Sequence, residues 1–398
     1  MIRSILRRVA VVTSYALSHV TRRDPRLWVF GNVKGFRDNP RYLAEHLVDA
    51  HPELEVWWIA RGAEEADAAR AAGLRVALRG RAGARVQRRA GAAFVSNGFA
   101  DLEPAHLGGA FVVDLRHGQG TKRILLDMPD RRLSAPSPLT RWIARARRWY
   151  IRRRLAQIDM IVAPGELERS RYVAAFGGRP ERIRVLGSPR FDVIHGGAAF
   201  ERVAGGDLRE RLGLDAGDRV ILWLPTWRDQ GDGWLPPLDG ALVDRAVAGS
   251  GVFLVKPHPY SDHAAFEARL PRHPRVRLLT DADVDVNCLL RITDVLVTDY
   301  SSAVFDFALL ERPISFFAPD VDEYRGGEGL QPEFTALLDD HAHRDWSSLF
   351  EELSAAVRGG VDPTVARRIL AESRNQDAPG SSERIARAVL GELGLTPA

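Results

Sequence analysis

The chain has 398 residues, more than one compact core usually holds, and this length predicts two domains. Hydrophobic residues make up 45% and charged residues 27%, an ordinary globular composition. No apolar run is long enough for a transmembrane helix. The single cysteine, Cys288, excludes an intrachain disulfide framework and fits a reducing cytoplasm. The net charge of +4 is largely local, because seven arginines lie within residues 141–154 and acids and bases nearly balance elsewhere.

Residues 1–26 are predicted to form an amphipathic, membrane-associating segment. Drawn as a helix, residues 1–20 place their apolar side chains on one stripe, with Arg3, Arg7, Ser14 and Ser18 off it. This pattern is typical of a helix that lies in a membrane interface. A helix packed on its own domain explains the pattern equally well. A signal peptide is not expected, because polar residues interrupt the apolar part and no convincing cleavage site follows.

Residues 27–188 alternate between strand and helix patterns. Strands are expected at 27–31, 54–60, 74–78, 92–96, 110–115, 158–163 and 183–186, with helices near 38–50 and 167–176 among the connections. Such alternation predicts a parallel, doubly wound sheet. Residues 27–188 are therefore expected to form an N-terminal Rossmann-like domain.

Residues 141–154 depart from this pattern. They carry seven arginines and no acid, interleaved with Trp142, Ile143, Trp149 and Tyr150. As a helix they would set an aromatic and aliphatic stripe beside a basic face, which suits anionic lipid headgroups. Nucleic acid would attract the same face, but no nucleic-acid motif accompanies it. A merely solvated basic face is the other interpretation.

A second alternating series follows a crossover near residues 187–206. Strands are expected at 220–224, 252–255, 276–279, 295–298 and 314–317, and helices at 364–373 and 382–393. Residues 189–375 are therefore expected to form a second Rossmann-like domain, and residues 376–398 a C-terminal helix that could fold back across the boundary. Two Rossmann-like, doubly wound domains facing a central cleft are the outline of the α/β GT-B fold, with ligands at the carboxyl ends of the strands.

The stretch 293–317 is predicted to contain an anion site. The strand 295–298 ends in a hydroxyl-rich turn, Asp299-Tyr300-Ser301-Ser302, and a helix pattern follows. Orphan backbone N–H groups and the positive end of the helix dipole would converge there beside two hydroxyls. An ordinary strand-to-helix corner whose serines cap the helix is an equally good explanation.

Basic residues and histidines follow other predicted strands. His117 comes after the strand 110–115 in a glycine-containing loop, and histidine is the usual general base near neutral pH. His258 has a proline on each side, which restricts its backbone. The basic residues of this group are Lys122, Arg123, Arg190, Arg228 and Lys256. Such a set of cations suits a diphosphate and the negative charge that develops on its leaving group. Their joint placement after strands favours a common site.

Metal and cofactor chemistry has little support in the sequence. Three Asp-x-Asp patterns, Asp281/Asp283, Asp283/Asp285 and Asp320/Asp322, invite a metal-bound nucleotide-sugar interpretation, but two of them overlap in a polar loop where acids are common. Zinc motifs such as a cysteine pair or His-Glu-x-x-His do not occur. We therefore expect neither a metal nor a cofactor.

Several motifs follow one another in order over roughly residues 27–330. They are Asp38-Asn39-Pro40-Arg41-Tyr42, Asn97, Gly187-Ser188-Pro189-Arg190-Phe191-Asp192, Pro225-Thr226-Trp227-Arg228-Asp229, Lys256-Pro257-His258-Pro259, and Asp299-Tyr300-Ser301-Ser302 with Asp306-Phe307. Together they resemble one family, the CDP-glycerol glycerophosphotransferases of the teichoic acid polymerase and primase group.

The resemblance implies transfer of glycerol phosphate from CDP-glycerol to an acceptor hydroxyl with release of CMP. It implies an acceptor-binding N-terminal domain, a CDP-donor C-terminal domain, and two catalytic histidines. His117 would take the acceptor proton, and His258 would help to hold the diphosphate. The substrate-binding residues it implies are Gly118, Lys122, Arg123, Arg190, Thr226, Trp227, Arg228, Lys256, Thr298, Asp299, Ser301, Ser302 and Asp306.

One departure from the family pattern concerns the loop after His117. The family's His-Gly-Thr-Pro-Leu-Lys is here His117-Gly118-Gln119-Gly120-Thr121-Lys122. That loop would face the acceptor, so the acceptor's identity stays open.

We expect a peripheral enzyme on the cytoplasmic face of the cell membrane that acts in teichoic-acid-like or capsular polymer synthesis. Its partners would be CDP-glycerol, a lipid-linked or surface-glycan acceptor and an anionic membrane surface, without nucleic acid; a homo-oligomer is left open. Transfer from CDP-ribitol or another CDP-polyol is a close alternative. Alternatives from other classes are a nucleotide-sugar epimerase of GT-B fold and a catalytically silent glycan-binding relative.

Overall fold

The computed structural model describes residues 13–128, 130–134, 136–228, 235–247, 250–258, 260–279, 284–328, 330–358 and 362–396. Most of the predicted membrane-associating helix therefore lies outside the described residues, as do Asp229, Pro259, Asp281 and Asp283. The chain forms two compact units. The N-terminal unit takes residues 1–117, 125–192 and 375–398, and the C-terminal unit takes residues 118–124 and 193–374, so each is discontinuous.

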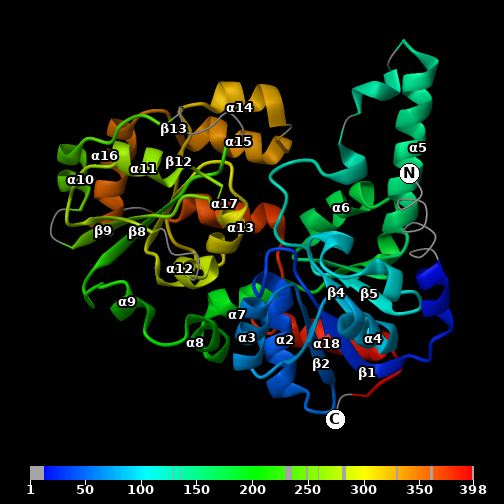
Figure 1. Cartoon of the computed structure of the whole chain (residues 1–398). Helices are drawn as coiled ribbons and strands as arrows, with labels where there is room; N and C mark the ends of the chain where they lie inside the picture. The colour runs from blue at the N-terminus through cyan, green and yellow to red at the C-terminus, as the bar shows by residue number, and fades with distance from the viewer. Residues whose placement is uncertain are drawn as a thin grey trace. The chain divides into compact units, whose positions relative to one another are not determined.

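The N-terminal unit is built on a seven-stranded sheet in the order β3-β2-β1-β4-β5-β6-β7, paired in parallel (Figure 1). Its strands are β1 (Asp24–Phe30), β2 (Glu55–Ala60), β3 (Arg75–Leu78), β4 (Ala90–Val95), β5 (Phe111–Asp114), β6 (Met160–Ala163) and β7 (Ile183–Val185). Its helices are α2 (Asp38–Ala50), α3 (Ala63–Ala71), α4 (Arg81–Arg89), α5 (Pro138–Leu155), α6 (Glu166–Ala175) and α18 (Ser381–Glu392), and α7 (Pro189–His195) leads out of the unit.

The C-terminal unit repeats this plan on a six-stranded parallel sheet in the order β10-β9-β8-β11-β12-β13. Its strands are β8 (Arg219–Leu224), β9 (Gly251–Val255), β10 (Val276–Leu278), β11 (Val295–Thr298), β12 (Ile314–Phe317) and β13 (Ala342–His343). Its helices are α8 (Ala198–Ala204), α9 (Leu208–Arg211), α10 (Gly240–Ala246), α11 (His263–Arg269), α12 (Val286–Ile292), α13 (Ala303–Ala308), α14 (Val321–Glu328), α15 (Pro332–His341), α16 (Trp346–Val357) and α17 (Thr364–Ser373).

Both sheets therefore have the strand order of a Rossmann fold. The chain starts in the middle of each sheet, moves outward to one edge, and returns to build the other half, so β1/β4 and β8/β11 are the points where the order reverses. In doubly wound sheets, ligands bind outside the carboxyl ends of the strands at such a reversal point. This topology fixes where each unit is expected to hold a ligand.

The central strands β4, β9 and β11 are almost entirely apolar because helices cover both faces of each sheet. In the C-terminal unit, Trp223 of β8 packs edge-on against Phe317 and Trp346, and Phe253 is its neighbour on β9. In the N-terminal unit, Ile385 and Val389 of α18 pack in the same core as Leu43 and Leu47 of α2. Figure 1 shows α18, in red, beside α2. The C-terminal helix 382–393 was expected to be able to fold back across the boundary, and α18 does so by packing in the N-terminal unit.

The predicted elements agree closely with those of the structure. The strand 295–298 and the helix 364–373 have the predicted bounds, and the other predicted strands are found within a few residues of their expected ends. The units divide the chain differently from the predicted boundaries. Their boundary lies after Asp192 rather than after residue 188, residues 375–398 belong to the N-terminal unit, and residues 118–124 belong to the C-terminal one.

Candidate active site

The predicted site residues gather at the carboxyl ends of the strands in each unit. In the C-terminal unit, residues 226–228 follow β8, residues 256–258 follow β9 and residues 299–302 follow β11. These three strands are neighbours in the sheet, and β8 and β11 flank the reversal point. In the N-terminal unit, His117 follows β5 and Arg190 lies in the first turn of α7.

His117 is held by one hydrogen bond that decides which ring nitrogen carries hydrogen. Its Nδ1 lies 3.3 Å from the carbonyl oxygen of Ser96, at the end of β4. A carbonyl oxygen only accepts, so Nδ1 donates and Nε2 keeps its lone pair. His117 keeps solvent-accessible surface even though protein atoms crowd around its ring. The ring is therefore arranged as a proton acceptor at Nε2.

The surroundings of His117 also keep the ring neutral. Burial among protein atoms lowers its pKa to about 4, and the positive charges of Arg116 and Lys34 act in the same direction. Arg116 has a positive φ of 54° and pairs with the buried Asp114. A histidine whose pKa lies well below neutrality is unprotonated at neutral pH, as a general base must be.

The loop that carries His117 is fixed by Asn39, which lies in the first turn of α2 and is 1% exposed. Its side-chain amide nitrogen donates to the carbonyl oxygen of Arg116 at 2.7 Å. Its side-chain oxygen accepts from the Ser188 hydroxyl and from the Arg190 backbone N–H, both at 3.0 Å. Asn39 therefore ties the end of β5 to the start of α7. The Asp38-Asn39-Pro40 motif was the signal for this role, although Asn39 was not among the predicted site residues.

Arg190 is buried, and its guanidinium donates to the carbonyl oxygen of His117 at 2.6 Å. The resemblance to the family implied that Arg190 belongs to the donor site. In the structure one of its side-chain nitrogens holds the backbone of the candidate base. Arg190 thus positions His117.

In the C-terminal unit, Asp299 joins the ends of β8 and β11. It is fully buried, and its carboxylate accepts from the Thr226 hydroxyl at 2.6 Å, from the Thr226 backbone N–H at 3.0 Å and from Arg228 at 2.9 Å. Thr298 adds a hydrogen bond from its hydroxyl to the carbonyl oxygen of Leu224. Thr226, Thr298 and Asp299 therefore form the frame of the site.

Arg228 completes this frame. It is 7% exposed, pairs with Asp299 and Asp320, and lies over the rings of Tyr300 and Tyr324. Burial alone would lower the pKa of Arg228, but the two carboxylates outweigh burial and raise it. Tyr300 donates from its hydroxyl to Asp320 and stacks on Tyr324 with ring centroids 3.6 Å apart. Tyr324 lies on α14, where no motif indicated it, whereas Asp320, just before α14, belongs to the Asp320/Asp322 pattern and pairs with Arg228.

His258 is held in the opposite way to His117. Its Nδ1 accepts a hydrogen bond from the backbone N–H of Tyr260 at 3.2 Å. In the neutral ring the hydrogen therefore sits on Nε2, which is a donor. The exposed ring of Tyr260 lies beside both His258 and Trp227.

Ser301 and Ser302 are half-buried at the start of α13. The hydroxyl of Ser301 accepts from the Ala303 backbone N–H at 3.2 Å, which is a capping contact, whereas Ser302 makes no capping bond through its side chain. Asp306 is buried within the helix, and Lys256 is half-buried after β9. The helix has only six residues, so its dipole is shorter than the sequence pattern suggested.

The loop after His117 belongs to the C-terminal unit. Thr121 accepts from the backbone N–H of Gln331, and the ammonium group of Lys122 lies 4.9 Å from the centre of the Tyr324 ring. Gly118 is half-buried and Arg123 is exposed. Gln119, in the part of the loop that departs from the family pattern, is 3% exposed, and its amide nitrogen and oxygen have no partner among the described residues. A polar group of a substrate would satisfy such an amide.

The aspartates of the Asp-x-Asp patterns that the structure describes serve the fold. Asp285 caps α12, Asp320 pairs with Arg228, and Asp322 pairs with Arg344. None of the three is arranged with another carboxylate as a metal site among the described residues.

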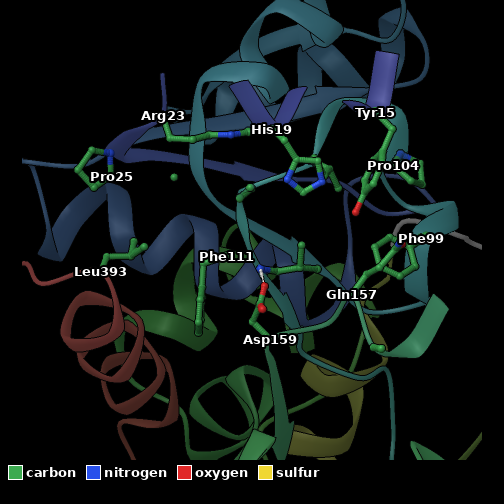
Figure 2. A pocket seen from close by; sticks show the side chains of 16 residues that line it. Tyr15, His19, Arg23, Pro25, Phe99, Pro104, Phe111, Gln157, Asp159 and Leu393 are labelled. Atoms are coloured by element: carbon green, nitrogen blue, oxygen red, sulfur yellow. Dashed lines mark hydrogen bonds between the residues drawn. The ribbon is translucent and has the colours of Figure 1, made fainter. Parts of the chain in front are cut away.

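A separate cavity of about 600 Å³ lies at the other edge of the N-terminal sheet (Figure 2). Its walls include Arg23 and Pro25 at the start of β1, Phe111 at the start of β5, and Asp159 just before β6. Because it opens at the amino ends of the strands, it is distinct from the edge that carries His117. None of the predicted site residues lines it.

Two Rossmann-like units define the chain as a member of the GT-B fold class. The chain also matches the model of the CDP-Glycerol:Poly(glycerophosphate) glycerophosphotransferase family over residues 13–391. It therefore belongs to that family, as the motifs predicted, and the family does not favour the epimerase alternative.

Two curated relatives show the extent of the similarity. The teichoic acid poly(glycerol phosphate) polymerase of Staphylococcus epidermidis is 26% identical over 330 residues, which are 79% of this chain and 43% of that protein. The teichoic acid poly(ribitol-phosphate) polymerase of Bacillus spizizenii is 31% identical over 173 residues, 41% of this chain and 27% of that protein. The aligned parts thus span less than half of either relative.

Solved structures of the wall teichoic acid polymerase TagF have the same fold. In a TagF variant soaked with CDPG, the match covers 99% of this chain and 98% of that one, with a TM-score of 0.75 and 21% identity. At this identity the likeness establishes the fold.

Proposed function

We propose that the protein transfers glycerol phosphate from CDP-glycerol to a hydroxyl group of a lipid-linked or surface-glycan acceptor and releases CMP. The observation that carries the proposal is the pair of oppositely arranged histidines in a chain of this family. His117 offers an acceptor nitrogen, and His258 offers a donor nitrogen. One reaction that needs both is the attack of a hydroxyl on a diphosphate.

The proposed chemistry is a single displacement at phosphorus. The acceptor hydroxyl gives its proton to Nε2 of His117, and its oxygen forms a bond to the phosphorus that carries glycerol. The bond from that phosphorus to the oxygen shared with the cytidine phosphate breaks, and its electron pair leaves with CMP. His117 would supply the base, and His258, Lys256, Ser301 and Ser302 would bind the diphosphate.

The donor groups in this scheme differ from the frame behind them. His258, Ser301, Ser302 and Lys256 are partly exposed and would contact the donor phosphates. Thr226, Thr298, Asp299 and Arg228 are bonded to one another or to the backbone and hold the loops in place. Of the residues implied as substrate-binding, we therefore assign this second group, together with Arg190, to positioning.

The direct test measures CMP release by purified protein with CDP-glycerol, CDP-ribitol and a bacterial membrane extract as the source of acceptor. CMP release that depends on both CDP-glycerol and the extract is expected. CDP-ribitol is the competing donor, because one similar relative is a poly(ribitol-phosphate) polymerase. A clear preference for CDP-ribitol would reassign the donor, and turnover of neither would remove the proposed activity.

We further propose that α5 and the helix formed by residues 13–20 hold the protein on an anionic membrane surface as a peripheral protein, on the cytoplasmic side where CDP-activated donors are made. None of the described helices is both long and apolar enough to cross a bilayer. Of the residues of α5 only Ala144 is buried, whereas Trp142, Ile143, Trp149 and Tyr150 are 51–66% exposed. Exposed aromatic residues beside arginines favour a lipid interface over a protein core.

The helix of residues 13–20 supports the same proposal. Its polar face is turned to the protein, where the Ser14 hydroxyl contacts His106 at 3.0 Å and Ser18 accepts from the Gly108 backbone N–H at 2.8 Å. Leu17 and Val20 on the predicted apolar stripe are 54% and 81% exposed. A helix packed on its own domain through its apolar face would show the reverse.

Co-sedimentation with vesicles of phosphatidylglycerol and phosphatidylcholine tests the membrane proposal. Replacing the exposed Arg145, Arg147 and Arg152 with Glu should abolish most binding, because each base near the surface contributes about 1 kcal/mol. Arg148 is left intact because it donates to the carbonyl oxygen of Leu126. Replacing Arg81, Arg85 and Arg89 of α4 with Glu makes the same charge change as a control. Equal binding by both variants would contradict a role of α5.

A further inference from the structure

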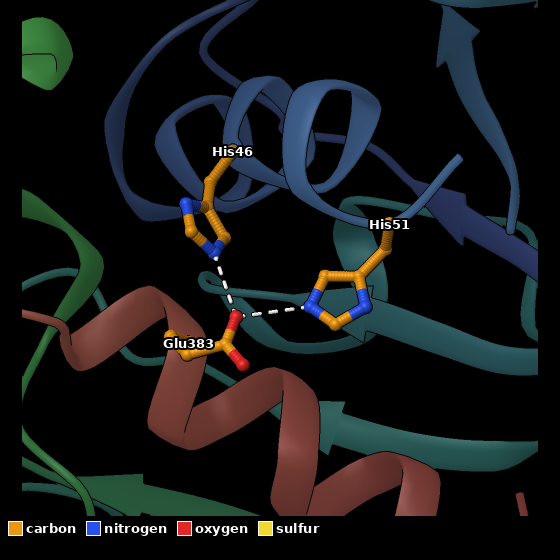
Figure 3. Close-up of side chains that lie close together, drawn as sticks. All are labelled: His46, His51 and Glu383. Atoms are coloured by element: carbon orange, nitrogen blue, oxygen red, sulfur yellow. Dashed lines mark hydrogen bonds and ion pairs between the residues drawn. The ribbon is translucent and has the colours of Figure 1, made fainter. Parts of the chain in front are cut away.

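Two histidines and a glutamate converge in the N-terminal unit where α2 meets α18 (Figure 3). His46 lies in the second half of α2, His51 is its C-cap residue, and Glu383 lies in the first turn of α18. The Nε2 atoms of His46 and His51 are 3.2 and 2.9 Å from the same atom, Oε2 of Glu383. None of these three residues takes part in the proposed transfer reaction.

The contacts of His51 require a positive charge. Its Nδ1 faces a carboxylate oxygen of Glu53 at 3.1 Å while its Nε2 faces Glu383. A neutral imidazole has one N–H, so one of its nitrogens would turn a lone pair toward a carboxylate. Either a second proton or a metal ion between Nε2 and Glu383 removes that repulsion. His51 is 5% exposed, which makes an uncompensated contact costly.

The donor set matches that of a divalent transition metal. Two imidazole nitrogens and one carboxylate oxygen are ligands that Zn²⁺ takes at about 2.0–2.2 Å, with water at an open fourth position. Ligands of a tetrahedral ion at such lengths lie about 3.3 Å apart, close to the two nitrogen–oxygen distances. The three ligand atoms all lie within 4.8 Å of one another. The side chains of His46 and Glu383 are about 30% exposed, which leaves a path for the ion and a water.

The neighbouring groups orient these ligands. Glu53 accepts from Nδ1 of His51, which leaves Nε2 as the ligand, the arrangement that carboxylates give to metal-bound histidines. Arg387 donates to Oε1 of Glu383 at 2.6 Å and leaves Oε2 to the histidines. The positive charge of Arg387 offsets part of the charge on Glu383, so the site is expected to bind through its imidazoles rather than as an acidic cluster.

We propose that His46, His51 and Glu383 bind a divalent first-row transition ion, with Zn²⁺ as its representative, which fastens α18 to α2. The ion would join residues more than 330 positions apart in sequence. It would act beside a second tie, in which Asp192 accepts from the backbone N–H groups of Gly380, Ser381 and Ser382 at the start of α18. The site is structural and does not depend on the proposed transferase activity.

The test uses the full chain without a histidine tag, treated with chelator and dialysed at pH 7.5. Titration with ZnCl2 by calorimetry should show one site per chain, and saturation should raise the Tm by several degrees, because a ligand that binds only the folded state stabilises it. MgCl2 should do neither, since Mg²⁺ prefers oxygen ligands. The single cysteine is buried and does not compete.

His46→Gln and Glu383→Gln should each weaken Zn²⁺ binding at least tenfold and remove the Tm shift. Both residues are partly exposed, so these variants are expected to fold, which circular dichroism would check. His273→Gln is the matched control, because His273 pairs with Asp244 at 2.8 Å as a single histidine and carboxylate. It should leave Zn²⁺ binding unchanged.

Two results would overturn the proposal. One is the absence of saturable Zn²⁺ binding in the wild-type chain, or binding that His46→Gln and Glu383→Gln leave intact. The other is evidence that the cluster holds a proton instead of a metal ion. Burial would lower the pKa of His51, but hydrogen bonds with Glu383 and Glu53 outweigh it and raise that pKa. In that case the Tm would fall as the pH rises past the pKa of His51, Glu383→Gln would abolish this dependence, and Zn²⁺ would have no effect.

Discussion

The two candidate catalytic histidines follow parallel strands in the two units, yet the backbone holds them in opposite ways. In the N-terminal unit a carbonyl oxygen takes the Nδ1 hydrogen of His117 and leaves Nε2 as an acceptor. In the C-terminal unit a backbone N–H occupies Nδ1 of His258 and leaves Nε2 as a donor. One backbone contact is thus enough to turn the same side chain into a base or into a hydrogen-bond donor.

The arginines behind the two loops differ as well. Arg190 donates to the backbone of His117, whereas Arg228 neutralises two buried carboxylates and stacks on two tyrosines. The first positions one residue, and the second holds three segments of the C-terminal unit together. Loss of either would reduce activity, but only loss of Arg228 is expected to weaken the fold strongly.

The largest expected effect is that of His117→Gln. Glutamine keeps the size and polarity of the side chain but cannot take the acceptor proton, so the rate of CMP release should fall by about 10²–10⁴. This corresponds to about 3–5 kcal/mol of barrier. Calorimetry with CDP-glycerol should show nearly unchanged donor affinity. A folded variant with normal turnover would contradict the role of His117 as the base.

Arg228→Met should destabilise the protein by about 3–5 kcal/mol, because removing one partner of a buried ion pair leaves unpaired charges. Denaturant unfolding followed by tryptophan fluorescence measures the change. Arg344→Met is the control: its pair with Asp322 is exposed on both sides, so its loss should leave the stability nearly unchanged. If Arg228→Met is as stable as the wild type but has lost its affinity for CDP-glycerol, then Arg228 contacts the donor and does not mainly hold the loops together.

The third prediction compares His258→Ala with His258→Gln. Alanine removes the Nε2 donor and should weaken CDP-glycerol binding by about 1.5–3 kcal/mol, the contribution of a hydrogen bond to a charged group. Glutamine offers an amide N–H and should recover part of this affinity. At position 117 the same glutamine should recover no activity. Equal donor affinities of His258→Ala and His258→Gln would show that Nε2 of His258 donates nothing to the donor.

The smallest effect is a shift in the pH dependence of kcat/KM. The pKa of His117 is lowered from its ordinary range to about 4, so the base stays unprotonated, and activity should persist, until the pH falls toward that value. Lys34→Gln removes a positive charge that lowers this pKa, so the acid limb should move to higher pH by a few tenths of a unit. Arg70→Gln, whose partner is the exposed Asp67, should leave the profile in place. An acid limb at the ordinary histidine pKa of about 6.5 would contradict the environment described for His117.

Much of the site was predictable because parallel strands place their carboxyl ends at one edge. The sequence placed motifs after the strands Val220–Leu224, Val252–Val255 and Val295–Thr298, and in the structure the corresponding strands β8, β9 and β11 are neighbours. What the sequence could not show was which polar groups face each other. Arg190 binds a backbone carbonyl, and Asp320 pairs with Arg228 although its Asp-x-Asp spacing suggested a metal ligand, because such contacts depend on side-chain direction rather than on spacing.

The cluster of His46, His51 and Glu383 could not be predicted from the sequence for a related reason. His46 and His51 stand five residues apart and have no spacing typical of a metal site, and Glu383 arrives on a helix from the other end of the sequence. Only the return of α18 to the N-terminal unit brings the three together. Conversely, the Asp-x-Asp patterns had a suggestive spacing, but those described are occupied by capping and ion pairs.

The return of α18 also has a consequence for synthesis on the ribosome. The core around Leu43 and Leu47 includes Ile385, Ala386 and Val389, so the N-terminal unit cannot close until these residues have emerged. At about 5–20 residues added per second, the apolar surface that α18 later covers stays exposed for roughly ten seconds or longer while the intervening chain is synthesised. The C-terminal unit, whose strands all precede α18, can mature first. We therefore expect the nascent N-terminal half to be the part of this protein that depends most on a chaperone.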